Sequence, residues 1–219
     1  MADGTVLLTG AAGVLGTWLR RTAPPGASVV SVVHRTLLDD APQVQADLRS
    51  AEQVRSALER ARPSLVVHAA YARDEASVVG ATHNVARAAS AVGAELIHIS
   101  SDAVFCGDGE PRDEQDRPDP ILDYGSWKAR AEALVAEEAP AAAIVRLPLI
   151  ISLDPEDHIV GAIRAGVRNR ERSVWFHDEL RQPALASELA EAVWRITALD
   201  EGDRSGPWHL PGPESLTRY

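Results

Sequence analysis

Short apolar runs alternate with longer amphipathic segments along the chain. The apolar runs have the length and the Val, Ile and Leu content of buried parallel strands, whereas the segments between them carry good helix formers. Strands are expected at 5–8, 29–33, 44–46, 65–70, 95–100 and 141–147. Helices are expected at 17–22, 50–62, 74–92, 123–139, 159–168 and 188–199. This alternation predicts an α/β fold with a doubly wound parallel (Rossmann) sheet, whose ligands gather at the carboxyl ends of the strands.

A glycine-rich turn joins the first strand to the first helix, with glycines at positions 10, 13 and 16. Glycine permits a tight turn and a close approach of backbone N–H groups to a phosphate, and the helix N-terminus adds partial positive charge. We therefore expect the turn to bind the pyrophosphate of a dinucleotide. The residues expected to contact it are Gly10, Ala12, Gly13, Val14, Leu15 and Gly16.

The second strand ends in His34 and Arg35, and no acidic residue lies at 33–36. In dinucleotide-binding folds an acidic residue here bonds the ribose 2′-OH, whereas Arg accommodates a 2′-phosphate. NADP(H) is therefore expected to be preferred, with NAD(H) also usable; the alternative is that Arg35 is a solvated charge. His68, inside a buried strand, is expected to be structural. Further cofactor contacts are expected at other strand ends, namely Asp47, Leu48, Ala69, Ala70 and Pro148.

Lys128 is the only lysine among 22 basic residues, and it follows Tyr124 by four positions in a predicted helix. Residues four apart share one helix face, so an ammonium would lie beside the phenol. A positive neighbour lowers a Tyr pKa from about 10, which predicts a general acid usable near neutral pH. Ser101, at the end of the fifth strand, could donate to a substrate carbonyl alongside Tyr124. The alternative for Ser101 is a cap or turn, although no regular helix is expected to follow it.

Composition limits the classes of partner. The chain has 219 residues and a net charge of −10, which argues against nucleic acid and anionic membrane surfaces. No apolar run approaches the ~20 residues of a membrane span. Cys106 is the one cysteine, so no intramolecular disulfide forms, and a reducing cytoplasm and the absence of a signal peptide are expected. A small-molecule substrate is the expected partner, no metal is expected, and a homodimer is left open.

The chain resembles the extended short-chain dehydrogenase/reductase superfamily, in particular its dTDP-4-dehydrorhamnose reductase family. The matching segments are TGAAGVLG (9–16), ADL (46–48), HAA (68–70), HISSDAVF (98–105), YGSWK (124–128), VRLP (145–148), RQPALASELA (181–190) and GPWHLPGPESLTRY (206–219). The resemblance implies an NADPH-dependent oxidoreductase, a ketoreductase acting on a nucleotide-linked deoxysugar; a non-sugar ketone is also compatible. It also implies that Ser101 is the catalytic hydroxyl, Tyr124 the proton donor and Lys128 its activating partner, and that Tyr124 and Lys128 both contact the cofactor.

The chain departs from the family in its last part. It stops at Tyr219, where relatives continue through the substrate-binding lobe, so either the sequence is truncated or the substrate site is smaller and more open. We expect a Rossmann core over 1–150 and a small, reduced substrate-facing part over 151–219. A local basic cluster there would suit a diphosphate-bearing substrate, although a solvated helix face is an equal alternative. The candidate substrate contacts are Asp102, Arg164 and Arg181.

Two substitutions and the short C-terminus favour a second function. The family's helix asparagine falls on Val78, and position 103, often Tyr in the rhamnose-type motif, is Ala. Relatives that resemble the same reductases serve as regulatory partners, such as the methionine adenosyltransferase β subunit. The alternative to an enzyme is therefore a non-catalytic, NADP-binding regulatory subunit, against which the retained Ser101, Tyr124 and Lys128 argue.

Overall fold

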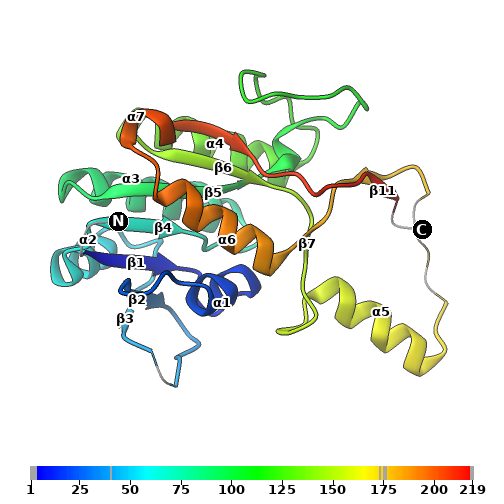
Figure 1. Ribbon diagram of the computed structural model, residues 1–219, viewed down its shortest axis with the longest axis horizontal. Helices are drawn as coiled ribbons and strands as arrows, with labels where there is room; N and C mark the ends of the chain where they lie inside the picture. Colours follow the sequence, from blue (N-terminus) through cyan, green and yellow to red (C-terminus); the bar gives the residue numbers. More distant parts are fainter. Residues whose placement is uncertain (1–3, 40, 173, 175–176, 218–219) are drawn as a thin grey trace.

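A seven-stranded parallel sheet forms the centre of the molecule (Figure 1). The computed structural model describes residues 4–39, 41–172, 174 and 177–217. The strand order is β10-β6-β5-β4-β1-β2-β3, and every neighbouring pair is parallel. Its strands are β1 (Thr5–Thr9), β2 (Ser28–Val33), β3 (Gln43–Gln45), β4 (Leu65–His68), β5 (Glu95–Ser101), β6 (Ala143–Leu147) and β10 (Gly206–His209). The order reverses beside β1, which confirms the predicted doubly wound sheet.

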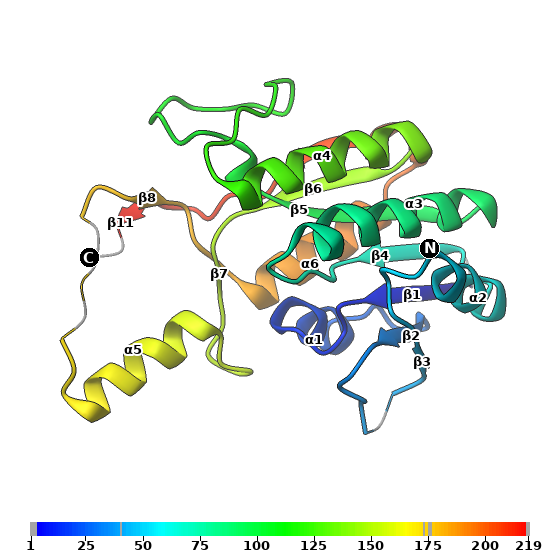
Figure 2. The same ribbon diagram turned by 180° about the vertical axis from the view of Figure 1, so that it is seen from behind.

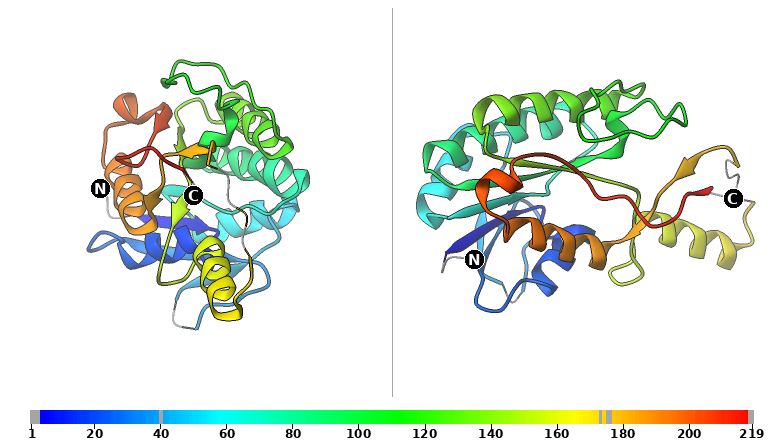
Figure 3. Two further views of the ribbon diagram at one scale, coloured as in Figure 1. Left: turned by 90° about the vertical axis from the view of Figure 1, so that its right-hand side faces the viewer. Right: turned by 45° about the horizontal axis from the view of Figure 1, so that its top comes forward.

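Helices cover both faces of the sheet. One face carries α1 (Val14–Arg21) and α6 (Ala186–Thr197), which pack on each other. The other carries α2 (Ala51–Ala61), α3 (Ala81–Ala91) and α4 (Asp123–Glu138), seen side by side in Figure 2. The three layers are visible together in the right-hand view of Figure 3. Such crossover helices follow from the alternating pattern of the sequence.

Two apolar clusters hold these layers together. Leu8 faces the cluster under α1 and α6, which includes Trp194, whereas Leu7 faces the cluster under α2, α3 and α4, which includes Val135. Successive side chains of a strand point to opposite faces, so adjacent residues of β1 serve both clusters. All four side chains are 5% exposed or less. The sheet is therefore buried on both sides, as the continuous apolar runs predict.

The chain after residue 150 contributes to two regions. α6 and β10 return to the sheet, with a short helix α7 (Glu201–Arg204) between them. The rest forms small pairs of strands and α5 (His158–Asn169), which lies apart from the sheet in Figures 1 and 3. The pairs are β7 (Ile150–Ile151) with β9 (Ala184–Leu185), and β8 (Leu180–Arg181) with β11 (Leu216–Thr217). In the described chain, no helix has the length and apolar character needed to cross a membrane.

The expected strands and helices are confirmed, with one correction. The helix expected at 74–92 starts as a π-helix, η1 (Ala76–Gly80), and becomes α3 only at Ala81. The cap role given as the alternative for Ser101 is present, because a single 3₁₀ turn, η2 (Asp102–Val104), comes directly after β5, although the next α-helix, α4, begins only at Asp123. Ser101 is the N-cap of this turn, and its Oγ accepts a hydrogen bond from the Ala103 N–H at 3.2 Å. The cap hydroxyl therefore has a structural role besides any chemical one.

Candidate functional site

The glycine turn after β1 is built so tightly that side chains are excluded from it. A Cβ at Gly16 would lie 2.1 Å from the Gly10 carbonyl oxygen, and one at Gly10 would lie 2.6 Å from the Ala69 carbonyl carbon. Gly10 has φ of +71°, which disfavours any other residue. Gly13 is the N-cap of α1; no side chain caps this end, and the first turn has no acidic residue. The first amides of α1 are thus available to an anion such as a phosphate.

A cavity of about 390 Å³ opens beside this turn at the carboxyl ends of β1, β2 and β4. Eight predicted cofactor contacts line it, namely Gly10, Ala12, Gly13, His34, Arg35, Asp47, Leu48 and Ala70. Seven others lie outside its lining, namely Val14, Leu15, Gly16, Ala69, Tyr124, Lys128 and Pro148. The side chain of Leu15 and the close contact of Gly16 with the turn also serve the packing of α1, while the backbone amides of both residues belong to the first turn of that helix.

The sequence reasoning missed several residues of this cavity, of which Arg49 and Tyr71 carry the most chemistry. Arg49 donates to both carboxylate oxygens of Asp47, with Nε–Oδ1 at 3.0 Å and Nη2–Oδ2 at 2.7 Å. This guanidinium holds the pKa of Asp47 well below its usual value. Arg35 makes no side-chain hydrogen bond or ion pair within the described chain. Two guanidinium groups therefore border the cavity, and only that of Arg49 has an acidic partner there.

Ser101, Tyr124 and Lys128 meet at the carboxyl end of β5. The Lys128 side chain is buried, and its Nζ donates to the Ile99 carbonyl oxygen at 2.9 Å. Tyr71, from the cavity, links the two regions: its ring lies 6.0 Å from the Tyr124 ring and 6.0 Å from Lys128 Nζ. Tyr71 follows directly after the HAA segment, and this position at the end of a predicted strand could have identified it as a candidate site residue.

The predicted lowering of the Tyr124 pKa by Lys128 is wrong. Burial raises the pKa of Tyr124 to about 12, Tyr71 adds to this, and a side-chain hydrogen bond with Ser101 opposes it. Burial also lowers the pKa of Lys128 to about 8, against the opposing charge of Glu132. Both groups are thus driven toward their neutral forms, because desolvation penalises charge. The phenol is consequently a firmly protonated hydrogen-bond donor.

The structural assignment of His68 is confirmed. Its ring nitrogens both have partners, Thr9 Oγ1 at 2.7 Å and Thr82 Oγ1 at 3.0 Å. Thr82 in turn donates to the Val78 carbonyl oxygen at 2.6 Å, so a buried polar chain reaches the position where the family asparagine was expected. Burial lowers the pKa of His68 to about 3, which keeps the ring neutral.

The candidate substrate residues separate into two places. Arg181 Nη2 contacts both carboxylate oxygens of Asp102 at 2.8 Å, and both charges are close enough to affect the pKa of Tyr124. Arg164 instead pairs with Glu156 at 2.5 Å on the exposed side of α5. The structure thus brings Asp102 and Arg181 to the Ser101–Tyr124 region and leaves Arg164 outside it.

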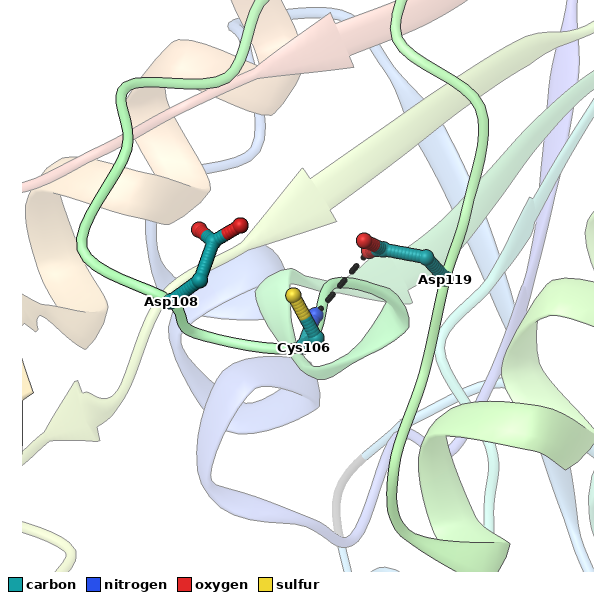
Figure 4. Close-up of side chains that lie close together, drawn as sticks. All are labelled: Cys106, Asp108 and Asp119. Carbon is teal, nitrogen blue, oxygen red and sulfur yellow. Dashed lines mark hydrogen bonds between the residues drawn. The ribbon is translucent and has the colours of Figure 1, made fainter.

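One cluster in the described chain has the atoms of a possible metal site. Cys106, Asp108 and Asp119 place one ligand atom each within 4.8 Å of one another (Figure 4). The Arg112 guanidinium occupies their centre, because its Nη2 lies 3.4 Å from Cys106 Sγ, 2.7 Å from Asp108 and 3.1 Å from Asp119. A hydrogen bond with Asp119 raises the pKa of the thiol. The cluster is therefore an arginine-centred clamp within the loop before α4.

Comparison with known proteins identifies the family. The profile described as RmlD substrate binding domain matches residues 4–219. The chain belongs to this RmlD family. A methionine adenosyltransferase 2 subunit beta of Rattus norvegicus is 31% identical and aligns with 98% of the chain and 69% of its own length. The dTDP-4-dehydrorhamnose reductase of Escherichia coli K12 is 29% identical, over 98% of the chain and 74% of that protein.

The fold of the RmlD-family chain also matches solved structures. A hypothetical dTDP-4-dehydrorhamnose reductase from Sulfolobus tokodaii superposes with a TM-score of 0.85 at 23% identity, covering 98% of this chain and 78% of that one. The resemblance drawn from the ordered motifs is thereby confirmed, as is the Rossmann architecture. The regulatory and the enzymatic relatives both share nearly all of this chain, so membership alone does not decide between the two functions.

Proposed function

We propose that this chain is an NADPH-dependent ketoreductase that reduces a keto group on a nucleotide-linked deoxysugar. The observation that carries the proposal is the meeting of Ser101, Tyr124 and Lys128 at one strand end, with Tyr71 connecting them to the cavity beside the glycine turn. A hydroxyl, a phenol and an ammonium at the carboxyl end of a parallel sheet form a site that can polarise and protonate a carbonyl group.

The cavity fits a dinucleotide with a 2′-phosphate. The uncapped start of α1 suits the pyrophosphate, and Arg35 with Arg49 supplies positive charge at the end of the cavity near β2 and β3. Arg49 is already engaged by Asp47, which leaves Arg35 as the main discriminator. Bound NADPH would supply the hydride. Solved structures with this fold hold NADP in some cases and NAD in others, so use of NADH as a weaker cofactor is compatible with the proposal.

The protein's own groups have distinct roles in the reduction. Tyr124 donates its phenolic proton to the carbonyl oxygen, and the Ser101 hydroxyl donates a hydrogen bond to the same oxygen. Lys128 supplies positive charge, which stabilises the phenolate left after proton transfer. Its pKa of about 8 leaves most of the amine protonated at pH 7. General acid catalysis of this type contributes about 10²- to 10⁴-fold in rate.

The substrate class rests on Arg181 and on the relatives. Arg181 lies beside Asp102 and Tyr124 and can exchange its carboxylate partner for a substrate phosphate, for which a guanidinium is the preferred ligand. The Escherichia coli relative is a dTDP-4-dehydrorhamnose reductase, which acts on a nucleotide-linked sugar. An anionic keto-sugar nucleotide therefore suits the site better than a neutral ketone.

The test combines binding and turnover. NADPH and NADH are titrated by fluorescence, and NADPH oxidation is measured against a panel of keto-sugar nucleotides and simple ketones. We expect tighter binding of NADPH, oxidation with a keto-sugar nucleotide, and a loss of about 10²- to 10⁴-fold in kcat for Tyr124→Phe with cofactor affinity retained. A Phe variant with undiminished turnover would refute the role of Tyr124, and failure to bind either cofactor would refute the function.

A regulatory subunit is the second candidate, favoured by the 31% identity to methionine adenosyltransferase 2 subunits beta. A protein of this kind would bind NADPH through the same turn but would not need a proton donor. Tight NADPH binding without oxidation across the panel, together with an unaltered phenotype of cells carrying Tyr124→Phe, would favour it. Loss of function in those cells would favour the enzyme.

A further inference from the structure

A buried ion pair lies one helical turn beyond Lys128. Glu132 on α4 and Arg146 on β6 have side chains only 6% and 5% exposed. Arg146 Nη2 donates to Glu132 Oε2 at 2.8 Å, and its Nε lies 3.2 Å from both carboxylate oxygens. Arg146 also contacts His209 Nε2 at 3.1 Å, from β10. None of these residues was singled out from the sequence, and none lines the dinucleotide cavity.

Glu132 of this ion pair also contacts the end of β5, the strand that carries Ser101. Ser100 donates to Glu132 Oε1 at 2.5 Å, and Lys128 donates to the neighbouring Ile99 carbonyl at 2.9 Å. Ser101, the next residue, is the proposed catalytic hydroxyl. Glu132 and Lys128 lie four residues apart on α4 and therefore share one helix face. Two charged groups of α4 thus hold the end of β5, because Lys128 bonds Ile99 and Glu132 bonds Ser100. Ser101 is the next residue of the strand.

Charge balance around Lys128 depends on Glu132. The ionisable side chains that interact with Lys128 are His68 from β4, His98 from β5, Tyr71 after β4 and Glu132 from α4. Tyr124, four residues earlier on α4, and Arg146 from β6 lie next to this set. Burial lowers the pKa of both histidines, so their rings are neutral at pH 7. Arg146 is cationic, which leaves Glu132 as the anion of this set. Its charge opposes the loss of the Lys128 proton that burial favours.

We propose that Glu132 is a positioning residue for the reaction centre: its carboxylate, fixed by Arg146 and Ser100, keeps the buried Lys128 ammonium charged and holds the end of β5 on which Lys128 rests. The kinetic part of this inference depends on the proposed ketoreductase function, whereas the part on the charge of Lys128 does not. A role in packing alone would not need the charge, since a buried ion pair can often be replaced by neutral groups of similar size without loss of stability.

The unique lysine makes the test direct. Protein labelled with ¹³C-lysine, with a lysine-free tag, gives one lysine side-chain signal, so its NMR titration reports the Lys128 pKa in each variant without any turnover. In Glu132→Gln we expect this pKa to fall by up to about two pH units. This is the effect of one charge at ~6 Å, the general spacing of residues four apart on a helix, with an effective dielectric constant of ~20. Glu132→Asp keeps the charge and is expected to restore most of the shift.

Matched controls separate charge from packing. Glu138→Gln removes a carboxylate from the same helix, where it pairs with His83 and not with Lys128, and should leave the titration unchanged. Because Glu132→Gln leaves Arg146 without its buried counter-ion, it could fail to fold. The double variant Glu132→Gln/Arg146→Gln removes both charges and is expected to fold. It should still show a lowered Lys128 pKa, because Glu132 raises that pKa in the folded protein. The fall should be smaller than in Glu132→Gln, because Arg146→Gln also removes a nearby positive charge.

The NMR titration and the activity assay test different parts of the inference. An unchanged Lys128 titration in a folded Glu132→Gln or double variant would overturn the inference. If the wild-type enzyme reduces a keto-sugar nucleotide, the alkaline limb of its kcat/KM profile should move to lower pH in Glu132→Gln by the shift seen by NMR; a limb that stays in place would also overturn the positioning role. Wild-type protein that never oxidises NADPH would refute the proposed function while leaving the NMR result valid.

Discussion

The two buried histidines predict that the protein loses stability between pH 7 and pH 5. His68 and His98 stack with ring centroids 5.5 Å apart, and both are 1% exposed. Their pKa values in the folded state are lowered by burial, first of all, and by the charge of Lys128. In the unfolded chain both regain ordinary values near 6.5. Below that pH the unfolded state binds more protons than the folded state, so acid favours unfolding.

The magnitude follows from the shift of His68. Its folded pKa is about 3, so at pH 5 it is neutral in the folded protein and protonated in the unfolded chain. Lowering the pH from 6.5 to 5 therefore lowers the free energy of unfolding by about 2 kcal/mol through this one group. His98 acts in the same direction. Carboxylates titrate mainly below pH 5, so a change in the free energy of unfolding between pH 7 and pH 5 comes mainly from histidines.

Urea unfolding followed by circular dichroism at pH 7, 6 and 5 measures this loss. His98→Leu should reduce it, because the variant lacks one of the two buried groups that take up a proton on unfolding. The substitution breaks no hydrogen bond, since neither His98 ring nitrogen has a partner in the described structure. His177→Gln changes an exposed histidine and should leave the pH dependence as it is in the wild type. A free energy of unfolding that stays constant from pH 7 to pH 5 would refute the account of two neutral, buried rings.

Two further pairs of variants test the turn and the substrate end. A Cβ at Gly16 would lie 2.1 Å from a backbone carbonyl oxygen, so Gly16→Ala should cost about 3 kcal/mol or more by urea unfolding; Gly80→Ala, with nothing within 4 Å, should instead stabilise by ~0.5–1 kcal/mol. Equal effects would contradict the packing of the turn. Arg181→Gln should raise KM for a keto-sugar nucleotide by roughly 10- to 100-fold, the loss of one charged hydrogen bond, whereas Arg164→Gln should leave KM unchanged. A KM that responds to Arg164 alone would place the substrate phosphate on α5.

The backbone of the site follows from the sequence because local chemistry determines it. The apolar runs specify buried strands, Gly10 has the positive φ that the turn requires, and Gly13 and Gly16 lie against the Gly10 carbonyl within the turn itself. Ser50, the first residue of the helix expected at 50–62, is its N-cap, and its hydroxyl accepts from the Gln53 N–H. Such features need only neighbours in the chain, which a single sequence displays.

Contacts between distant segments were harder to anticipate. Arg49 and Tyr71 reach the cavity from strand ends whose side-chain directions depend on the sheet, and Arg181 meets Asp102 across 79 residues. The π-helix at the start of α3 was equally hidden, since nothing in its sequence, ASVVG, distinguishes a π-helix from an α-helix. In each case the sequence shows which residues could act, and the tertiary arrangement decides which of them do.

The failed expectation about the Tyr124 pKa bears on the role proposed for this residue. Spacing of four residues correctly placed Tyr124 and Lys128 on one helix face, but burial dominates the pKa of both. A phenol with a pKa of about 12 is a poor general base at neutral pH, because almost none of it is ionised to accept a proton. It remains a competent donor to an oxygen that gains negative charge. The environment of Tyr124 therefore suits the proton-donor role in the proposed reduction. In that reaction a Lys128 ammonium kept charged by Glu132, as proposed above, would make the phenolate less costly.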